Sequence, residues 1–180
     1  LLSDRAFGGA DTCATSTTIA AGIKKMGGAD IIFAGRQAID GDTAQVGPQI
    51  AQRLKLPVVT YVQKVEIQGD KVIVERQLED GYEKIEVQTP CLLTCVKELN
   101  EPRYMTPGGI FDACDKEITV WGRADLTDLD DANIGLKGSP TKIAKASDKV
   151  RKGAGEKFTP DSPDEAAKII VDALLTKHII

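Results

Sequence analysis

The chain has 180 residues, of which 42% are apolar and 28% are charged, and its formal net charge is -4. This length and composition favour a single folded core with appendages. The 23 basic residues are interspersed with 27 acidic ones, so we expect no nucleic-acid partner, since phosphate-binding surfaces need clustered cations. No apolar run approaches the ~20 residues that span a bilayer. We therefore expect no membrane span and a cytoplasmic location.

The first 56 residues predict two units, each made of a strand, a polar loop and a helix. Leu1 and Leu2 look like the end of a buried strand, so we expect a fragment that lacks N-terminal strands. Residues 31–34 form a second strand that is apolar on both faces, which is typical of a parallel sheet. Apolar residues at helical spacing mark the two helices: Ile19, Ile23 and Met26, then Val46, Ile50 and Leu54.

Residues 57–88 alternate between apolar and charged side chains, with turn signals at Gly69-Asp70 and Asp80-Gly81. This pattern predicts an antiparallel meander with one solvated face. Residues 91–96 then return to the core as a buried strand. The predicted fold class is α/β: a Rossmann-like open parallel sheet with helices on both faces and an antiparallel β extension.

Regular periodicity fades between residues 125 and 159, which is typical of an arm or a solvated tail. We favour an extended C-terminal arm that contacts a partner, because it carries spaced apolar residues. They are Trp121, Leu126, Leu129, Ile134 and Leu136. Ser162, Pro163 and Glu165 match a capping box that begins a closing amphipathic helix. The expected parts are an α/β domain over residues 1–120, an arm over 121–160 and a helix over 161–180.

Few side chains in this sequence can carry acid-base or nucleophilic chemistry. The one histidine, His178, lies near the C-terminus, and no serine lies in a G-x-S-x-G motif. The cysteines lack the paired spacing of a metal or redox site, so we expect no metal and buried free thiols. They are Cys13, Cys91, Cys95 and Cys114. Any redox chemistry would therefore need an organic cofactor.

Two loops that follow the predicted parallel strands share a pattern and lead directly into helices. The first is GADT at residues 9–12, and the second is DGDT at residues 40–43. Such loops lie at the carboxyl edge of a parallel sheet, where helix starts present unpaired N–H groups that can bind a phosphate. The same residue types also suit simple helix capping. The spacing alone leaves both interpretations open.

Residues 34–47, AGRQAIDGDTAQVG, resemble the nucleotide-binding loop of electron-transfer flavoprotein β subunits. Residues 90–94 and 99–104, PCLLT and LNEPRY, are similar to the signature of the same family. This resemblance implies a heterodimer with an α subunit, on which the redox FAD is mainly seated. Oxidoreductase activity would belong only to that complex.

The resemblance also implies which residues bind the nucleotide. The N–H groups of residues 43–46 would receive the phosphate, and the first loop would complete the pocket. Arg36 is the side chain best able to offset phosphate charge. The expected cofactor-binding residues are Asp11, Thr12, Ala14, Thr15, Gly35, Arg36, Gln37, Asp42, Thr43, Ala44, Gln45 and Val46.

Three stretches look like the electron-bifurcating, NADH-using branch of the family: residues 4–16, 41–46 and 135–141. In that branch the β subunit holds a second FAD that accepts a hydride from NADH. The electrons then divide between ferredoxin or flavodoxin and a route to an acyl-CoA dehydrogenase. In non-bifurcating members the loop holds a structural AMP, which is the alternative interpretation. A stand-alone nucleotide-binding module is an alternative of another class, which the long arm disfavours.

Residues 104–110 match the loop with which this family recognises its dehydrogenase partner. The expected contact residues are Tyr104, Met105, Thr106, Pro107 and Ile110. The chain departs from non-bifurcating members here, because Pro107 follows the threonine where those members have a leucine. That departure disfavours docking to the usual broad set of dehydrogenases. A plain Gly-Pro turn is the alternative interpretation.

Overall fold

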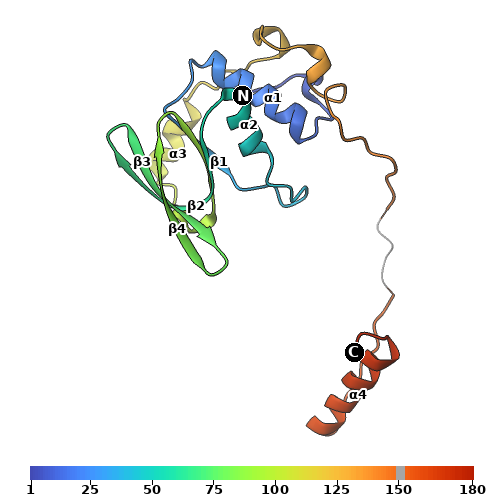
Figure 1. Cartoon of the computed structure of the whole chain (residues 1–180). Coiled ribbons are helices and arrows are strands. Elements are labelled where there is room, and N and C mark those ends of the chain that lie inside the picture. The colour runs from blue at the N-terminus through green and yellow to red at the C-terminus, as the bar shows by residue number, and fades with distance from the viewer. Residues whose placement is uncertain (149–152) are drawn as a thin grey trace. The chain divides into compact units, whose positions relative to one another are not determined.

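The computed structural model describes residues 1–148 and 153–180, which belong to two compact units (Figure 1). The first unit, Leu1–Lys142, contains the whole sheet, and the second, Ile143–Ile180, contains the closing helix. The predicted α/β class is confirmed. Among the described residues, no helix combines the length and the apolar character needed to cross a membrane.

Five strands form one open sheet in the order β1-β5-β2-β3-β4. β5 (Cys91–Cys95) lies between β1 (Ile31–Gly35) and β2 (Val58–Gln68), and it is parallel to both. β3 (Lys71–Leu78) and β4 (Gly81–Gln88) continue the sheet as antiparallel strands. β2, β3 and β4 together form a twisted antiparallel ribbon (Figure 1). The predicted strands at residues 31–34 and 91–96, the meander and both turns are therefore confirmed. The expectation that Leu1 and Leu2 end a buried strand of this sheet is wrong, because Leu2 forms only an isolated bridge with Trp121 and Leu1 is exposed.

Two helices cover one face of the parallel strands. α1 (Thr12–Lys25) packs on α2 (Val46–Leu54), and α2 contacts β5. Their apolar stripes meet the sheet in one cluster: Ile19, Ile23, Ile50, Ala51 and Leu54 against Ile32, Ala34 and Leu92. Helices were expected on both faces. A second apolar cluster contains Val72, Val74 and Val87 of the antiparallel strands beside Cys91 and Leu93 of β5. Among the described residues this cluster includes Leu99 but no residue of an α-helix, so the expectation of a helix packed there is wrong.

The segment after the sheet packs on the α/β domain up to residue 141. Leu126, Leu129 and Ile134 are buried against Ala21 of α1. Their predicted role in wrapping a partner is therefore wrong. Two 3₁₀ turns, η3 (Arg123–Asp125) and η4 (Asp131–Asn133), carry this packing, which explains why no helical or strand period marks the segment. The expected boundary at residue 120 lies inside this unit, and a partner contact beyond residue 142 stays a prediction.

Two further helices are capped as their sequences indicate. α4 (Pro163–Thr176) begins after Ser162, whose hydroxyl accepts the Glu165 N–H at 3.2 Å. α3 (Pro107–Cys114) begins after Thr106, whose hydroxyl accepts the Gly109 N–H at 3.1 Å. The Gly-Pro turn considered for this region is thus the first turn of a helix. Neither helix buries a residue.

All four cysteines are free thiols, as expected, but only Cys91 is fully buried. Cys114 is exposed at the end of α3, which corrects the expectation that it is buried. Burial raises the pKa of the Cys91 and Cys95 thiols. Both therefore stay protonated and unreactive near neutral pH.

Candidate functional site

The two loops singled out in the sequence meet at the carboxyl edge of the sheet. The Thr12 hydroxyl, at the start of α1, donates to Gln45 Oε1 at 2.9 Å, immediately before α2. β1 ends at Gly35, and the Arg36 N–H donates to the Cys95 carbonyl at 3.2 Å. The second loop therefore follows β1 at this edge, and the start of α1 reaches it through the contact between Thr12 and Gln45.

The second loop has an unusual backbone. Asp42 and Ala44 adopt positive φ angles of 49° and 52°. Gln45 is the N-cap of α2, but its side chain makes no capping hydrogen bond. In the described part of the chain, no acceptor is recorded for the N–H groups of residues 43–47. Residues with positive φ followed by a right-handed residue such as Gln45, with open N–H groups, resemble the concave backbone arrangement that binds anions in other proteins.

Two contacts hold this loop in place. Gln37 Nε2 donates to Asp42 Oδ1, and the Asp42 N–H donates to the Ala38 carbonyl at 3.0 Å. Both contacts lie within the loop, so the positive φ at Asp42 is supported locally.

Gly47 brings the start of α2 close to the sheet. A Cβ atom at this position would lie 2.6 Å from Thr94 Cγ2 on β5 and 3.5 Å from Ala34 Cβ on β1. Only glycine allows this approach without a shift of the helix. The open N–H groups of the loop are therefore fixed relative to the strand ends.

The first loop is built differently. Asp11 is the N-cap of α1, and its Oδ1 accepts the N–H groups of Cys13 and Ala14 at 2.9 and 3.0 Å. The Thr15 N–H donates to the Asp11 carbonyl at 2.9 Å. Ala14 is fully buried. Thr12 is thus the residue of this loop whose side chain reaches the second loop.

Asp11 also joins the first loop to a distant segment. Its Oδ2 accepts the Thr141 N–H at 3.0 Å, and its own N–H donates to Ser139 Oγ at 2.8 Å. Burial alone would raise the pKa of the Asp11 carboxyl, but hydrogen bonds from Thr141, Ala14 and Cys13 outweigh it and hold the pKa below its usual range. The carboxylate form is therefore favoured in the folded state.

A polar network joins α1 and α2 behind the loops. Buried Ser16 Oγ lies 2.8 Å from the Cys13 carbonyl and 3.0 Å from Gln49 Oε1, and it accepts Arg53 Nε at 2.9 Å. Arg53 Nη2 also donates to the Cys13 carbonyl at 3.0 Å. These bonds fix the relative position of the two helix starts.

The sequence analysis missed Tyr61 and Arg76, which lie beside Arg36. Together with residues 77–79 these three line a cavity of about 420 Å³, and the Arg36 guanidinium lies 5.8 Å from the centre of the Tyr61 ring. The buried Nε of Arg76 has no hydrogen-bond partner in the described structure. The sequence could have indicated the inward position of Arg76, because this residue follows the buried residues Val72 and Val74 at every second position on β3.

The predicted partner residues are exposed and contiguous. Tyr104 is 99% exposed, Met105 and Ile110 are exposed, and Thr106 and Pro107 begin α3. The structure thus presents these side chains for contact, while their partner stays a prediction.

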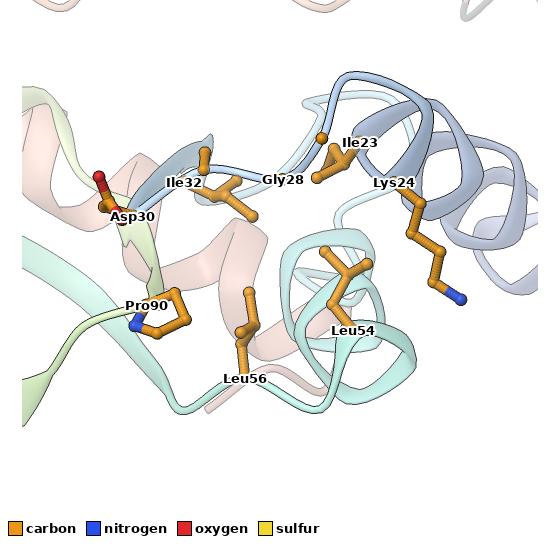
Figure 2. A pocket seen from close by; sticks show the side chains of 10 residues that line it. Ile23, Lys24, Gly28, Asp30, Ile32, Leu54, Leu56 and Pro90 are labelled. Atoms are coloured by element: carbon orange, nitrogen blue, oxygen red, sulfur yellow. The ribbon is translucent and has the colours of Figure 1, made fainter.

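A cavity of about 480 Å³ lies at the opposite, amino edge of the parallel strands. Figure 2 shows that Ile23, Ile32 and Leu54 gather around it, whereas the amino group of Lys24 points away. Its lining is mixed, and Lys24 and Asp30 are its charged residues. This cavity does not resemble a phosphate site, and the candidate site stays at the carboxyl edge.

Comparison with known proteins identifies the family. The sequence model of the electron transfer flavoprotein domain matches residues 1–126. The chain belongs to the electron transfer flavoprotein family. It is 61% identical to the electron transfer flavoprotein subunit beta of Clostridium acetobutylicum over 181 residues, which cover 100% of this chain and 68% of that protein. The predicted resemblance to electron transfer flavoprotein β subunits is therefore confirmed.

Two relatives carry names that refer to acyl-CoA reductases. One is the caffeyl-CoA reductase-Etf complex subunit CarD of Acetobacterium woodii, 60% identical over 180 residues, with 100% of this chain and 68% of the relative covered. The other is the acryloyl-CoA reductase electron transfer subunit gamma of Anaerotignum propionicum, 49% identical over 186 residues, with 100% and 69% covered. This electron transfer flavoprotein chain is thus similar along its whole length to subunits of redox complexes.

Proposed function

We propose that this chain is the β-type subunit of an electron-bifurcating electron transfer flavoprotein and binds FAD at the start of α2. The observation that carries the proposal is the run of open N–H groups over residues 43–47, shaped by positive φ angles at Asp42 and Ala44. Phosphate oxygens are strong acceptors for such groups, and the helix dipole adds to the attraction. The pyrophosphate of FAD fits this arrangement.

Neighbouring side chains suit the rest of a nucleotide. The Asp42 carboxylate repels a phosphate but accepts hydrogen bonds from ribose hydroxyls. The contact between Thr12 and Gln45 bounds one side of the site. Arg36, Tyr61 and Arg76 add cationic and aromatic side chains in the cavity that Arg36 shares with β2 and β3. FAD would supply hydride acceptance and single-electron transfer when bound. The chain's own residues would bind it, orient it and offset its charge.

The remaining parts of the proposal concern partners. An α subunit would complete a heterodimer and carry the redox FAD, and NADH would be the electron donor. Electrons would pass to ferredoxin or flavodoxin and, through residues 104–110, to an acyl-CoA dehydrogenase. The names of the Acetobacterium and Anaerotignum relatives support an acyl-CoA-linked enzyme. The four free thiols suit a reducing compartment, and we place the complex in the cytoplasm.

Counting the bound nucleotides of the complex with its α subunit tests the proposal. We expect acid extraction and chromatography to give two FAD per heterodimer, and we expect NADH to bleach flavin absorbance. One FAD plus one AMP, with no bleaching by NADH, would identify the non-bifurcating alternative and reject the proposal.

A charge variant tests the position of the phosphate. Ala44→Asp places a carboxylate among the open N–H groups, and we expect FAD affinity to fall by about tenfold or more. Ala44→Asn is the matched control, since Asn has nearly the same shape and also tolerates a positive φ. Fluorescence titration with FAD measures both. Equal affinities of the two variants would show that no phosphate lies at this loop.

A further inference from the structure

We propose that a separate cationic cavity beside the first loop binds a phosphate-bearing small molecule. The cavity has a volume of about 300 Å³, and its lining includes Arg5, Gly8, Arg123, Asp131 and Lys137. Neither Thr12 nor any residue of the second loop lines it. The cavity is therefore distinct from the site proposed for FAD, and this inference does not depend on which nucleotide occupies that site.

The walls of the cavity come from two stretches that are far apart in sequence. Residues 135–141 pack on residues 5–11, and the Cβ atom of Leu136 lies 3.4 Å from where a Cβ at Gly9 would be. Buried Ser139 accepts the Asp11 N–H at 2.8 Å and donates to the Gly135 carbonyl at 2.7 Å. Both stretches were noted in the sequence, and the site at α2 does not account for residues 135–141.

Close backbone contacts make this junction rigid. A Cβ atom at Gly135 would lie 2.1 Å from the Ala6 carbonyl oxygen, and one at Gly138 would lie 2.1 Å from the Asn133 carbonyl carbon. Gly135 also has a φ of 54°. Since no side chain fits at Gly135, the two stretches meet backbone to backbone there, while Gly138 lets the later stretch fold tightly on its own backbone at Asn133. The cavity between the two stretches is therefore preformed.

The charges of the cavity favour an anion. Arg123 contacts Asp131 at 2.5 Å and donates to the carbonyls of Leu126 and Leu129. This ion pair therefore stabilises the wall of the cavity and adds little to its net charge. The Asp4 carboxylate does not line the cavity, and it accepts hydrogen bonds from the N–H groups of Ala6 and Arg123. Within the described chain no carboxylate lies within ion-pair distance of Arg5 or Lys137. Two cations without an ion-pair partner therefore line one small cavity.

Two cations of different shape suit a phosphate or pyrophosphate group. A guanidinium can bind two phosphate oxygens at once, and an ammonium adds a point charge. The volume lies at the low end of the range for small-molecule sites, which favours part of a dinucleotide over a whole one. The ligand class is thus a phosphate-bearing small molecule that presents its anionic end to Arg5 and Lys137.

Calorimetric titration of the full chain with inorganic pyrophosphate tests the proposal. The chain is first saturated with FAD so that the α2 site does not contribute. We expect pyrophosphate binding that falls by about tenfold in Arg5→Ala and in Lys137→Ala. Lys142→Ala, which removes a nearby exposed cation outside the cavity, is the matched control and should bind as wild type. ADP-ribose is the second probe: tighter binding than pyrophosphate identifies half of a dinucleotide as the ligand, and weaker binding identifies inorganic phosphates.

Two results would overturn the proposal: wild-type affinity in both cavity variants, or an equal loss in Lys142→Ala. Failure of the proposed function gives a different result. A chain that does not bind FAD but binds pyrophosphate through Arg5 and Lys137 supports this site and rejects the other. Ala44→Asp should leave pyrophosphate binding to the FAD-free protein dependent on Arg5, because the two sites share no residue.

Discussion

The starts of α1 and α2 look alike in sequence but differ in structure. Gly-Ala-Asp-Thr stands at the start of α1 and Gly-Asp-Thr stands in the loop before α2, and the two helix starts contact each other through Thr12 and Gln45. At α1 the aspartate directly precedes the helix and accepts two of its first N–H groups. At α2 the aspartate lies four residues before the helix, and no side chain caps the helix start.

This difference separates a structural helix cap from a candidate anion site. Asp11 satisfies α1 internally, so this helix has few N–H groups left for a ligand. Asp42 and Ala44 instead use positive φ angles to extend the loop, which leaves the N–H groups of α2 open. The Asp-Thr pair therefore has different roles at the two helices, because Asp11 directly precedes α1 whereas Asp42 lies four residues before α2.

The largest expected effect comes from filling the space at Gly47. We expect Gly47→Ala to lower the free energy of unfolding by about 1–3 kcal/mol, because its Cβ would overlap Thr94 on β5. FAD affinity should fall with it, since α2 must shift. Gly41→Ala is the control in the same loop, as no atom lies near its Cβ position. Urea denaturation measures both variants, and equal stabilities would show that α2 is not held by this contact.

The next effect compares the two aspartates. Asp11→Ala removes the cap of α1 and the bond to Thr141, and we expect a loss of about 1–2 kcal/mol in the free energy of unfolding. Asp42→Gly keeps a residue that tolerates positive φ, and we expect a change within about 0.5 kcal/mol. The FAD affinity of Asp42→Gly should fall more than that of Asp11→Ala, because the Asp42 carboxylate would accept hydrogen bonds from the ribose hydroxyls. Reversed effects on stability and affinity would contradict the division of roles.

The fold was largely predictable because its signals are local. The buried strand β5, the period-two meander and the helical stripes each follow from neighbouring residues, and the structure confirms them. Residues 121–141 were not predictable in this way, because single residues such as Leu126 and Ile134 are buried by a distant helix without a repeating pattern. α3 was missed because two glycines disfavour a helix, although Thr106 and Pro107 match a helix start.

The candidate site was predictable in position but not in detail. Two loops after parallel strands point to one sheet edge by topology alone. Which helix start is open depends on backbone angles at Asp42 and Ala44, and sequence patterns do not determine these. Arg76 lies on a strand far from both loops, so only the pairing of β2 with β3 brings it near.

A smaller effect should appear as pH falls. The pKa of Asp11 is lowered in the folded chain, so its stabilising contribution is complete above the unfolded pKa of ~3.9 and is lost as pH falls through the folded value. We expect wild type to lose more stability below about pH 4 than Asp11→Asn, whose side chain caps α1 without titrating. Thermal unfolding at several pH values measures this. Parallel curves for the two proteins would show that Asp11 does not contribute.

The smallest expected effect concerns the contact between the two loops. The Thr12 hydroxyl donates to Gln45 Oε1 at 2.9 Å in an exposed position, so we expect a coupling of only about 0.5 kcal/mol in a double-mutant cycle of Thr12→Val with Gln45→Ala. Thr15→Val with Gln45→Ala is the matched control, since no side-chain bond joins that pair among the described contacts. Urea denaturation gives the four stabilities of each cycle.

If bound FAD bridges the two helix starts, the Thr12–Gln45 coupling should increase on its addition while the control stays near zero. A coupling of zero with and without FAD would mean that the two starts act independently, and that α2 alone forms the site.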